Sequence, residues 1–232
     1  MIRVFIGYDH SETVAFHVAA HSILRRASAP VLIAGLKLAQ LPMWRKPDPR
    51  QSTEFAFSRF LVPYLCGYEG RAIFMDCDVL CRANIIELWS ALSARRAVAV
   101  VQHNYTPKEG DKFLGHGQSA YGRKNWSSVM VFNNPACRAL TPEYVNTAKG
   151  LDLHQFHWTD DDMVQGLDPA WNHLVGEYAP NPGAKLAHFT LGTPCFAKYR
   201  HCEFAGEWYA ERDDMLHHDR SGEFSKPARQ EQ

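Results

Sequence analysis

The chain has 232 residues, of which 46% are apolar and 22% are charged, as in an ordinary globular domain rather than a disordered or fibrous chain. Its 25 Lys and Arg residues balance 25 Asp and Glu residues, which excludes the broad positive field that nonspecific nucleic-acid binding requires. A chain of this length buries roughly 70–75% of its extended surface on folding, so it forms a core without structural metal or disulfides.

The N-terminal part of the chain predicts a strand, a helix and a second strand. Residues 2–7 are mainly β-branched or aromatic, and the apolar side chains that follow Ser11 recur at helical spacing. Ser11 belongs to the residue types that cap helices. Residues 31–36 predict the next strand, so the chain opens with a βαβ unit. The aromatic residues between 52 and 65 predict a second helix.

The middle of the chain predicts further strands around a long polar loop. Residues 71–76 form an apolar run without alternation, which is typical of a central strand buried on both faces. A short helix is expected over 85–92, and strands are expected over 97–102 and 126–133. The polar, glycine-rich stretch 104–125 predicts a loop of the kind that carries function.

The C-terminal part continues the alternation of helices and strands. The pattern predicts helices over 135–148 and 160–167, strands over 171–176 and 185–189, helical structure from 196, and a frayed tail from 221. We therefore expect one α/β domain over residues 1–200, followed by a helical appendage and tail over 201–232.

The sequence carries no signal for a transmembrane helix. Apolar stretches such as 97–101 are far shorter than the 18 or more residues that a spanning helix needs. Asp9 interrupts the N-terminal apolar run too early for a secretory signal, and the six cysteines form no CxxC pair and no framework of close spacings. We expect a cytoplasmic protein, for which peripheral membrane contact stays open.

Asp76 and Asp78 stand where the buried strand 71–76 ends. In open α/β sheets, ligands bind beyond the carboxyl ends of the strands. Two carboxylates this close repel each other unless a cation lies between them, and Mg²⁺ or Mn²⁺ bridging a diphosphate is the usual arrangement. The pair predicts a divalent-metal site, with a role in capping the loop as the alternative.

Further candidate residues lie in the second half of the chain. His188 precedes Gly192; its imidazole is an acceptable Mn²⁺ ligand, although a core or surface role explains a histidine taken alone. Gly192 would let backbone amides approach a phosphate. Asp160 and Asp161 open a predicted helix and complement its dipole, yet one carboxylate pointing into a cleft would orient a sugar hydroxyl or act as base or nucleophile.

Two more polar positions interrupt apolar segments. Arg59 lies in the aromatic helix, where an arginine commonly pairs with a carboxylate or phosphate or else lies at an exposed rim. Ser127 and Ser128 lie in an otherwise apolar strand, so their hydroxyl groups face solvent or line a pocket.

Taken in chain order, these segments resemble family 8 glycosyltransferases. The resemblance runs from residue 2 to about residue 196 and rests on Gly7-Tyr8-Asp9, Arg59, Asp76-Cys77-Asp78, Ser127-Ser128-Val129, Asp160-Asp161-Asp162 and His188-Phe189-Thr190 followed by Gly192. It implies a GT-A fold: a single Rossmann-like domain with a mostly parallel central sheet flanked by helices. It also implies transfer of a hexose, with retention, from a nucleotide-diphosphate sugar such as a UDP-sugar to a glycan or lipid-linked acceptor.

The resemblance implies a role for each matching residue. Asp76, Asp78 and His188 match the ligands of Mn²⁺ (or Mg²⁺), and Asp76 also lies near the ribose. The donor-binding positions are Gly7, Tyr8 and Asp9 at the nucleobase, together with Arg59, Ser128 and Gly192, whereas Asp160 and Asp161 match the segment that contacts the transferred sugar. Asp161 stands where many members have Gln, so we hypothesise that its carboxylate is the nucleophile on the donor anomeric carbon.

Two other functions compete with the transferase. The family has a Lys that binds the diphosphate, and this chain has the run Thr193-Pro194-Cys195 in its place. Lys198 or Arg200 would then have to bind the diphosphate. The absence of the Lys makes a nucleotide-sugar-binding module with little turnover the main alternative. A haloacid-dehalogenase-like, Mg²⁺-dependent phosphatase also uses D-x-D. That motif normally ends the first strand of such enzymes, whereas a βαβ unit precedes it here.

Overall fold

The computed structural model describes residues 1–46, 53–104 and 122–217. The strands are β1 (Ile2–Tyr8), β2 (Val31–Lys37), β3 (Arg71–Met75), β4 (Val79–Cys81), β5 (Val98–Val100), β6 (Val129–Asn133), β7 (Val164–Gly166), β8 (His173–Leu174) and β9 (Leu186–His188). The α-helices are α1 (Thr13–Arg26), α2 (Val62–Leu65), α3 (Ile85–Ala91), α4 (Pro142–Thr147), α5 (Gly150–His154) and α6 (Ala205–Met215).

A six-stranded sheet with the order β2-β1-β3-β6-β5-β7 forms the centre of the fold. β1 pairs in parallel with β2 and β3, which confirms the predicted βαβ start. β6 is antiparallel to both β3 and β5, and β5 is parallel to β7. All strands of this sheet except β6 therefore run in one direction, so the expected α/β fold with a mostly parallel sheet is confirmed.

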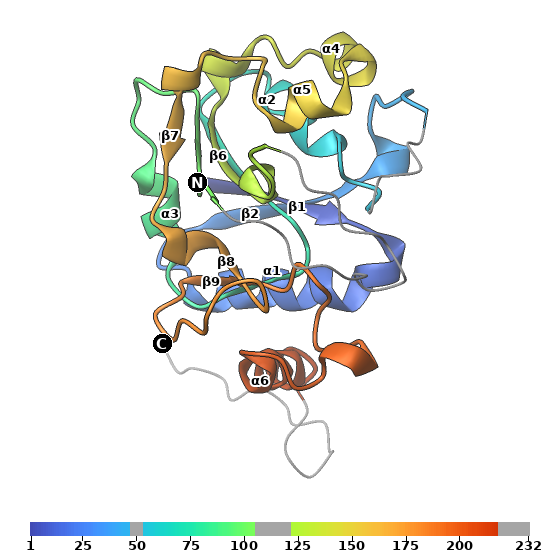
Figure 1. The fold of residues 1–232 in the computed structure, drawn as a ribbon, viewed down its shortest axis with the longest axis vertical. Coiled ribbons are helices and arrows are strands. Elements are labelled where there is room, and N and C mark those ends of the chain that lie inside the picture. The colour runs from blue at the N-terminus through green and yellow to red at the C-terminus, as the bar shows by residue number, and fades with distance from the viewer. Residues whose placement is uncertain (47–52, 105–121, 218–232) are drawn as a thin grey trace.

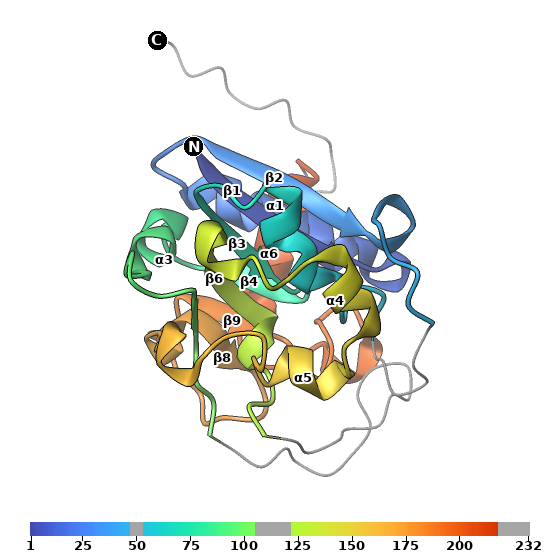
Figure 2. The same cartoon turned by 90° about the horizontal axis from the view of Figure 1, so that it is seen from above.

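Helices cover this sheet on both sides. Helix α1 runs below β1 and β2, while α2, α4 and α5 lie above the sheet (Figure 1). A second sheet, with the order β4-β9-β8, lies beside α1, and α1 contacts β4. Figure 2 shows from above how α4 and α5 cover the side of the sheet near β6. The polypeptide that links β3 to β4 thus passes from the large sheet to the small one.

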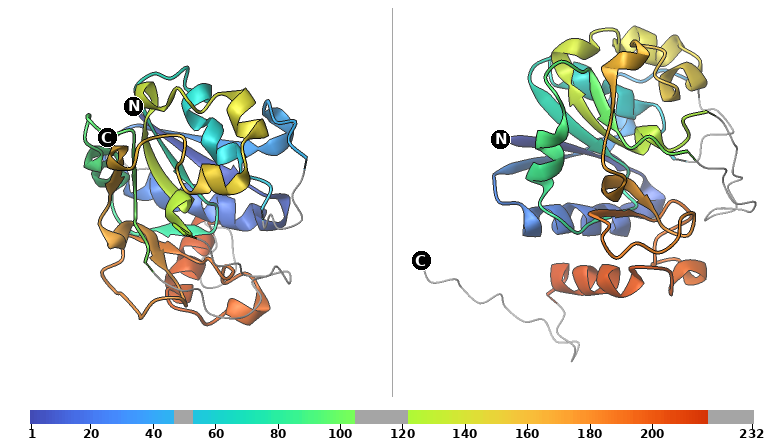
Figure 3. Two further views of the ribbon diagram at one scale, coloured as in Figure 1. Left: turned by 45° about the horizontal axis from the view of Figure 1, so that its top comes forward. Right: turned by 60° about the vertical axis from the view of Figure 1, so that its left-hand side comes forward.

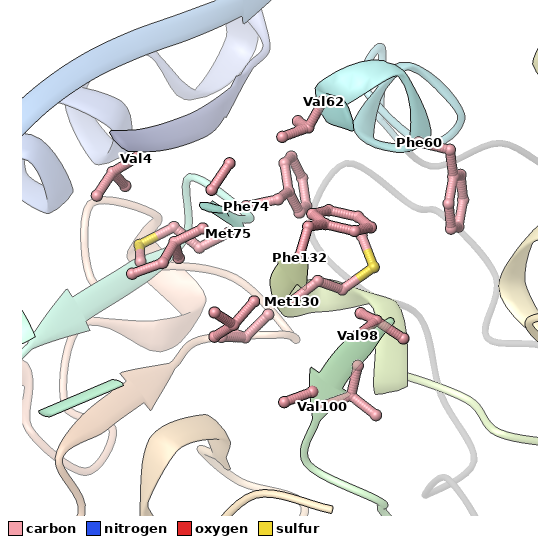
Figure 4. Packing of buried hydrophobic residues seen from close by; sticks show 14 of the residues in the cluster. Val4, Phe60, Val62, Phe74, Met75, Val98, Val100, Met130 and Phe132 are labelled. Carbon is pink, nitrogen blue, oxygen red and sulfur yellow. The ribbon is translucent and has the colours of Figure 1, made fainter. Parts of the chain in front are cut away.

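The core lies on the two faces of the central strands. Phe74 and Met75 of β3 pack beside Met130 and Phe132 of β6, and all four side chains are fully buried (Figure 4). The predicted burial of the strand 71–76 on both faces is correct for its centre, because all four residues from Ala72 to Met75 are fully buried.

Three predicted helices are wrong in extent or in type. The stretch 135–148 contains a 3-10 turn, Asn134–Cys137, and then α4, instead of one continuous helix. Within residues 160–167, Asp161–Met163 forms one 3-10 turn and Val164 begins β7, because Val164 pairs with Val98 and the sheet satisfies its backbone. In the region 52–65, the described residues form a 3-10 turn, Ser58–Leu61, followed by the short α2. Ser52 lies outside the described residues.

Other local predictions differ in detail. The cap expected from Ser11 is supplied instead by Asp9, whose carboxylate accepts from the Ser11 amide at the start of a 3-10 turn, His10–Glu12. The predicted strand 126–133 begins with a 3-10 turn, Trp126–Ser128, and only then becomes β6. Most of the predicted loop 104–125 lies outside the described residues.

Helix α6 packs against the rest of the chain. It lies on the side of α1 away from the large sheet (Figure 3). Trp208 is fully buried in a small core with Val18, Leu80 and Phe189. The buried Glu211 carboxylate pairs with Arg26 at 2.7 Å, which joins α6 to α1. The tail predicted from residue 221 lies outside the described residues.

No helix within the described residues combines the length and the apolar character that crossing a membrane requires.

Candidate metal centre and donor site

The small sheet places Asp78 beside His188. Val79 at the start of β4 is opposite His188 at the end of β9. The Phe189 amide donates to the Asp78 carbonyl at 2.8 Å, so the pairing continues past the strand ends. His188 Nε2 lies 3.3 Å from Asp78 Oδ1, and both side chains are almost completely buried. The antiparallel register therefore decides that these two residues meet.

Asp76 is held from the large sheet. Its amide donates to the Ser128 carbonyl at 2.9 Å, and its carboxylate Oδ1 lies 2.9 Å from Nη1 of Arg59. The buried guanidinium of Arg59 also donates to the Ser127 carbonyl at 2.9 Å and lies 5.0 Å from the centre of the Phe74 ring. The aromatic residues that flank Arg59 thus hold its cation against Asp76, and an exposed rim position for Arg59 is wrong.

The structure brings Asp76, Asp78 and His188 together. One candidate ligand atom of each lies within 4.8 Å of the others. An ion with bonds of about 2.2 Å has donors about 3–4.4 Å apart, so small side-chain movements complete such a set. Two carboxylates and one imidazole are a donor set that Mn²⁺ accepts, and Mg²⁺ uses carboxylates in the same way. The residues present therefore fit a divalent cation.

Glu12 lies close to this acidic group and is almost fully buried. Burial, followed by the negative charges of Asp78 and Asp9, raises the pKa of Glu12 to about 9. Cys77 Sγ lies 3.6 Å from its Oε2 atom. The neighbourhood of Asp78 is therefore strongly unfavourable to a further negative charge, which is the electrostatic condition that a bound cation relieves.

The end of β1 and Asp9, which follows it, are held by contacts within the protein. A Cβ atom on Gly7 would lie 2.4 Å from the Phe55 ring, so this position requires glycine for close packing. The Tyr8 ring packs edge-on against Phe16, with 5.4 Å between centres. The Asp9 carboxylate accepts from the amides of Ser11 and Glu54, at 2.9 and 3.1 Å.

Ser128 and Gly192 lie close to residues of the candidate metal centre: the Ser128 carbonyl accepts from the Asp76 amide, and Gly192 follows His188 by four residues. The buried Ser128 hydroxyl donates to the Asn125 carbonyl at 2.7 Å and accepts from Asn172 Nδ2 at 2.8 Å. Gly192 has φ of 144°, a backbone conformation that favours glycine, and its amide donates to the Phe189 carbonyl.

Asp160 and Asp161 are not among the three residues whose candidate ligand atoms lie within 4.8 Å of one another. The Met163 carbonyl accepts from the amide of Ala97, so the segment before β7 lies where β5 begins. β3 and β5 run in the same direction, because both are antiparallel to β6. Asp76 follows the carboxyl end of β3, whereas the Met163 carbonyl contacts the amino end of β5. The exposed Asp161 carboxylate pairs with Arg123 at 2.7 Å.

Two residues that we did not predict lie close to the cluster. His103 follows β5 at the carboxyl edge of the sheet, where ligands bind in open α/β folds. Its position after a predicted strand could have identified it as a candidate site residue. Burial, followed by the neighbouring His188 and His173, lowers the pKa of His103 to about 3. Asn172, which is fully buried, accepts from Nδ1 of His188 at 2.9 Å, and no periodicity in the sequence marks it.

A cavity of about 730 Å³ lies between α1 and α6. Thr13 and His17 line it from α1, and Arg212 lines it from α6. Cys195 and Arg200, from the segment that follows Gly192, line it as well. Lys198 is exposed, and its Nζ atom lies 5.4 Å from the centre of the Tyr199 ring.

A curated relative resembles almost the whole chain. Protein CDI of Arabidopsis thaliana is 42% identical over 223 residues, which cover 91% of this chain and 86% of that protein. No family model matches the chain.

Solved structures of glycosyltransferases have the same fold. The WbbM bifunctional glycosyltransferase superimposes with a TM-score of 0.66 at 15% identity over 91% of this chain, and GlyE of Streptococcus pneumoniae with 0.58 at 13% over 91%. The chain spans only 49% of the WbbM chain and 60% of the GlyE chain. The galactosyltransferase LgtC, solved with donor and acceptor sugar analogues, gives 0.57 at 11% identity and is covered over 96% of its length. The expected GT-A fold is confirmed.

Proposed function

The chain belongs to the same family as Protein CDI of Arabidopsis thaliana, and we propose that it is a metal-dependent glycosyltransferase of the family 8 type. Its donor is a nucleotide-diphosphate sugar, with UDP as the expected nucleotide. It transfers the hexose, with retention, to a glycan or lipid-linked acceptor. The observation that carries the proposal is the convergence of Asp76, Asp78 and His188 at the carboxyl edge of a GT-A sheet.

In this proposal, the three clustered side chains hold the divalent cation. A bound Mn²⁺ or Mg²⁺ ion supplies positive charge where the departing diphosphate gains negative charge. Arg59 fixes the carboxylate of Asp76 through its 2.9 Å contact, so that ligand is oriented before the cation binds.

Arg200 is our candidate for the cation that holds the diphosphate. The family Lys is absent from Thr193-Pro194-Cys195, and Arg200 lines the cavity together with Cys195. A guanidinium binds phosphate oxygens in a bidentate manner, so Arg200 would take over the role of the missing ammonium group. The nucleobase is expected at the carboxyl end of β1, at Gly7, Tyr8 and Asp9, where the Tyr8 side chain is half-buried.

A screen of nucleotide sugars tests the proposal. Purified protein is incubated with each donor, with Mn²⁺ or with a chelator, and the released nucleoside diphosphate is measured. We expect Mn²⁺-dependent turnover of at least one UDP-sugar, reduced more than 100-fold in Asp78→Asn. Asp162→Asn is the matched control, because it replaces the same carboxylate by the same amide at a side chain that is 77% exposed.

The other outcomes identify the competing functions. Mn²⁺-dependent binding of a UDP-sugar without any turnover would make the chain a binding module. Release of phosphate from simple monoesters, with no response to UDP-sugars, would point to a phosphatase and overturn the proposal.

A further inference from the structure

Asn172 connects the turn that precedes β6 to the imidazole of His188. It lies directly before β8, and its side chain is fully buried. Its Nδ2 atom donates to the Ser128 hydroxyl at 2.8 Å and to the Asn125 carbonyl at 3.3 Å. Its Oδ1 atom lies 2.9 Å from Nδ1 of His188.

These contacts fix the orientation of the Asn172 amide. A backbone carbonyl only accepts hydrogen bonds, so the group that faces Asn125 must be the NH₂ end. The Ser128 hydroxyl already donates to that same carbonyl at 2.7 Å, which leaves its oxygen to accept from Asn172. The Oδ1 atom of Asn172 therefore faces His188.

The orientation of the amide selects the tautomer of His188. An amide oxygen only accepts, so Nδ1 of His188 carries the proton in the neutral ring. The Nε2 lone pair then points toward Asp78, 3.3 Å away. A lone pair beside a carboxylate gains nothing from that contact without a cation, whereas it is a ready ligand for one.

We propose that Asn172 is a positioning residue that keeps His188 in the Nδ1–H tautomer and so presents Nε2 as a metal ligand. The inference rests on the proposed function, because it concerns the same metal centre. Without Asn172, the ring can place its proton on Nε2 and donate to Asp78, which closes the ligand position. Ser128 takes part indirectly, since its hydroxyl helps to hold the amide.

The first test needs no substitution. The ¹⁵N chemical shifts of the His188 ring, measured in metal-free protein at a pH where the ring is neutral, report which nitrogen carries the proton. We expect Nδ1 to be protonated and Nε2 to be bare. A proton found on Nε2 would overturn the inference.

Two variants test the role of the amide. Asn172→Leu removes the acceptor, so we expect Nε2–H in the neutral ring and an Mn²⁺ dissociation constant 10- to 100-fold higher. Asn172→Asp keeps an acceptor for Nδ1–H, so it should retain the wild-type tautomer and bind Mn²⁺ within 10-fold of the wild type. Titration calorimetry with MnCl₂ alone provides the affinities. A leucine variant that folds and binds Mn²⁺ within threefold of the wild type refutes the positioning role.

These measurements separate this inference from the proposed function. If the chain is not a transferase, nucleotide sugars are not turned over, yet the tautomer and the Mn²⁺ affinities still follow Asn172. If Asn172 has no positioning role, transfer proceeds while the ring protonation or the leucine variant gives the contrary result.

Discussion

The substitution Asp78→Asn should stabilise the metal-free protein while it abolishes metal binding. Candidate ligand atoms of Asp76 and Asp78 lie within 4.8 Å of each other. Two unit negative charges at that separation repel by about 3 kcal/mol at an effective dielectric constant of about 20. Arg59, 2.9 Å from Asp76, offsets part of that repulsion.

The amide of the variant adds a favourable contact. Its NH₂ group can donate to the Nε2 atom of His188, which lies 3.3 Å from Oδ1 of Asp78. We therefore expect the free energy of unfolding to rise by about 1–3 kcal/mol in the absence of metal. For a domain of this size, 1 kcal/mol corresponds to about 2–4 °C, so Tm should increase by about 2–12 °C.

Thermal unfolding with a chelator and with millimolar MnCl₂ measures both effects. The wild type should gain Tm on addition of Mn²⁺, because an ion that binds only the native state stabilises it. The Asp78→Asn variant should start higher and gain almost nothing. The control Asp162→Asn should behave like the wild type in both conditions. A lower Tm for Asp78→Asn without metal, or an unchanged response to Mn²⁺, would refute the electrostatic reasoning.

Three further predictions concern other parts of the molecule. Glu211→Ala should lower the free energy of unfolding by about 3–5 kcal/mol, since it leaves Arg26 beside an emptied, buried site between α1 and α6; a denaturant titration that gives less than 1 kcal/mol would contradict this. Burial, followed by nearby Arg cations, lowers the pKa of His154 to about 3, so only the unfolded chain takes up this proton as the pH falls below 6.5, and stability decreases. The wild type should lose about 2 kcal/mol between pH 6.5 and pH 5 at this site, and His154→Gln should not; equal pH dependence in urea unfolding would exclude His154 as the cause. Asp161→Asn should retain transfer activity within about threefold, since the exposed Asp161 carboxylate is paired with Arg123, whereas a loss of about 1,000-fold would favour the nucleophile hypothesis.

Local sequence patterns correctly predicted the elements whose side chains face the core in a regular period. Apolar spacing predicts β1, α1, β2 and β3, because the pattern of apolar residues within each segment shows which of its faces are buried. The same patterns failed at residues 160–167. The short pattern of apolar and polar residues there is compatible with a helix and with an edge strand. Residues 164–166 form a strand because they pair with β5.

The candidate site divides in the same way. Asp76 and Asp78 were predictable as candidate ligands, because a carboxylate pair stands at the end of a buried strand and strand ends form one edge. His188 was suggested only by family resemblance. Its meeting with Asp78 depends on the antiparallel register of β4 and β9, which belong to distant parts of the chain.

The sequence by itself therefore determined the fold class and the first two carboxylates of the site, since both depend on local burial and strand direction. Tertiary structure alone decided that Asn172 contacts His188, that Glu12 lies against Cys77 near the acidic cluster, and that Asp161 pairs with Arg123. The physical reason is that side-chain contacts between distant strands depend on register and packing, which no single segment encodes.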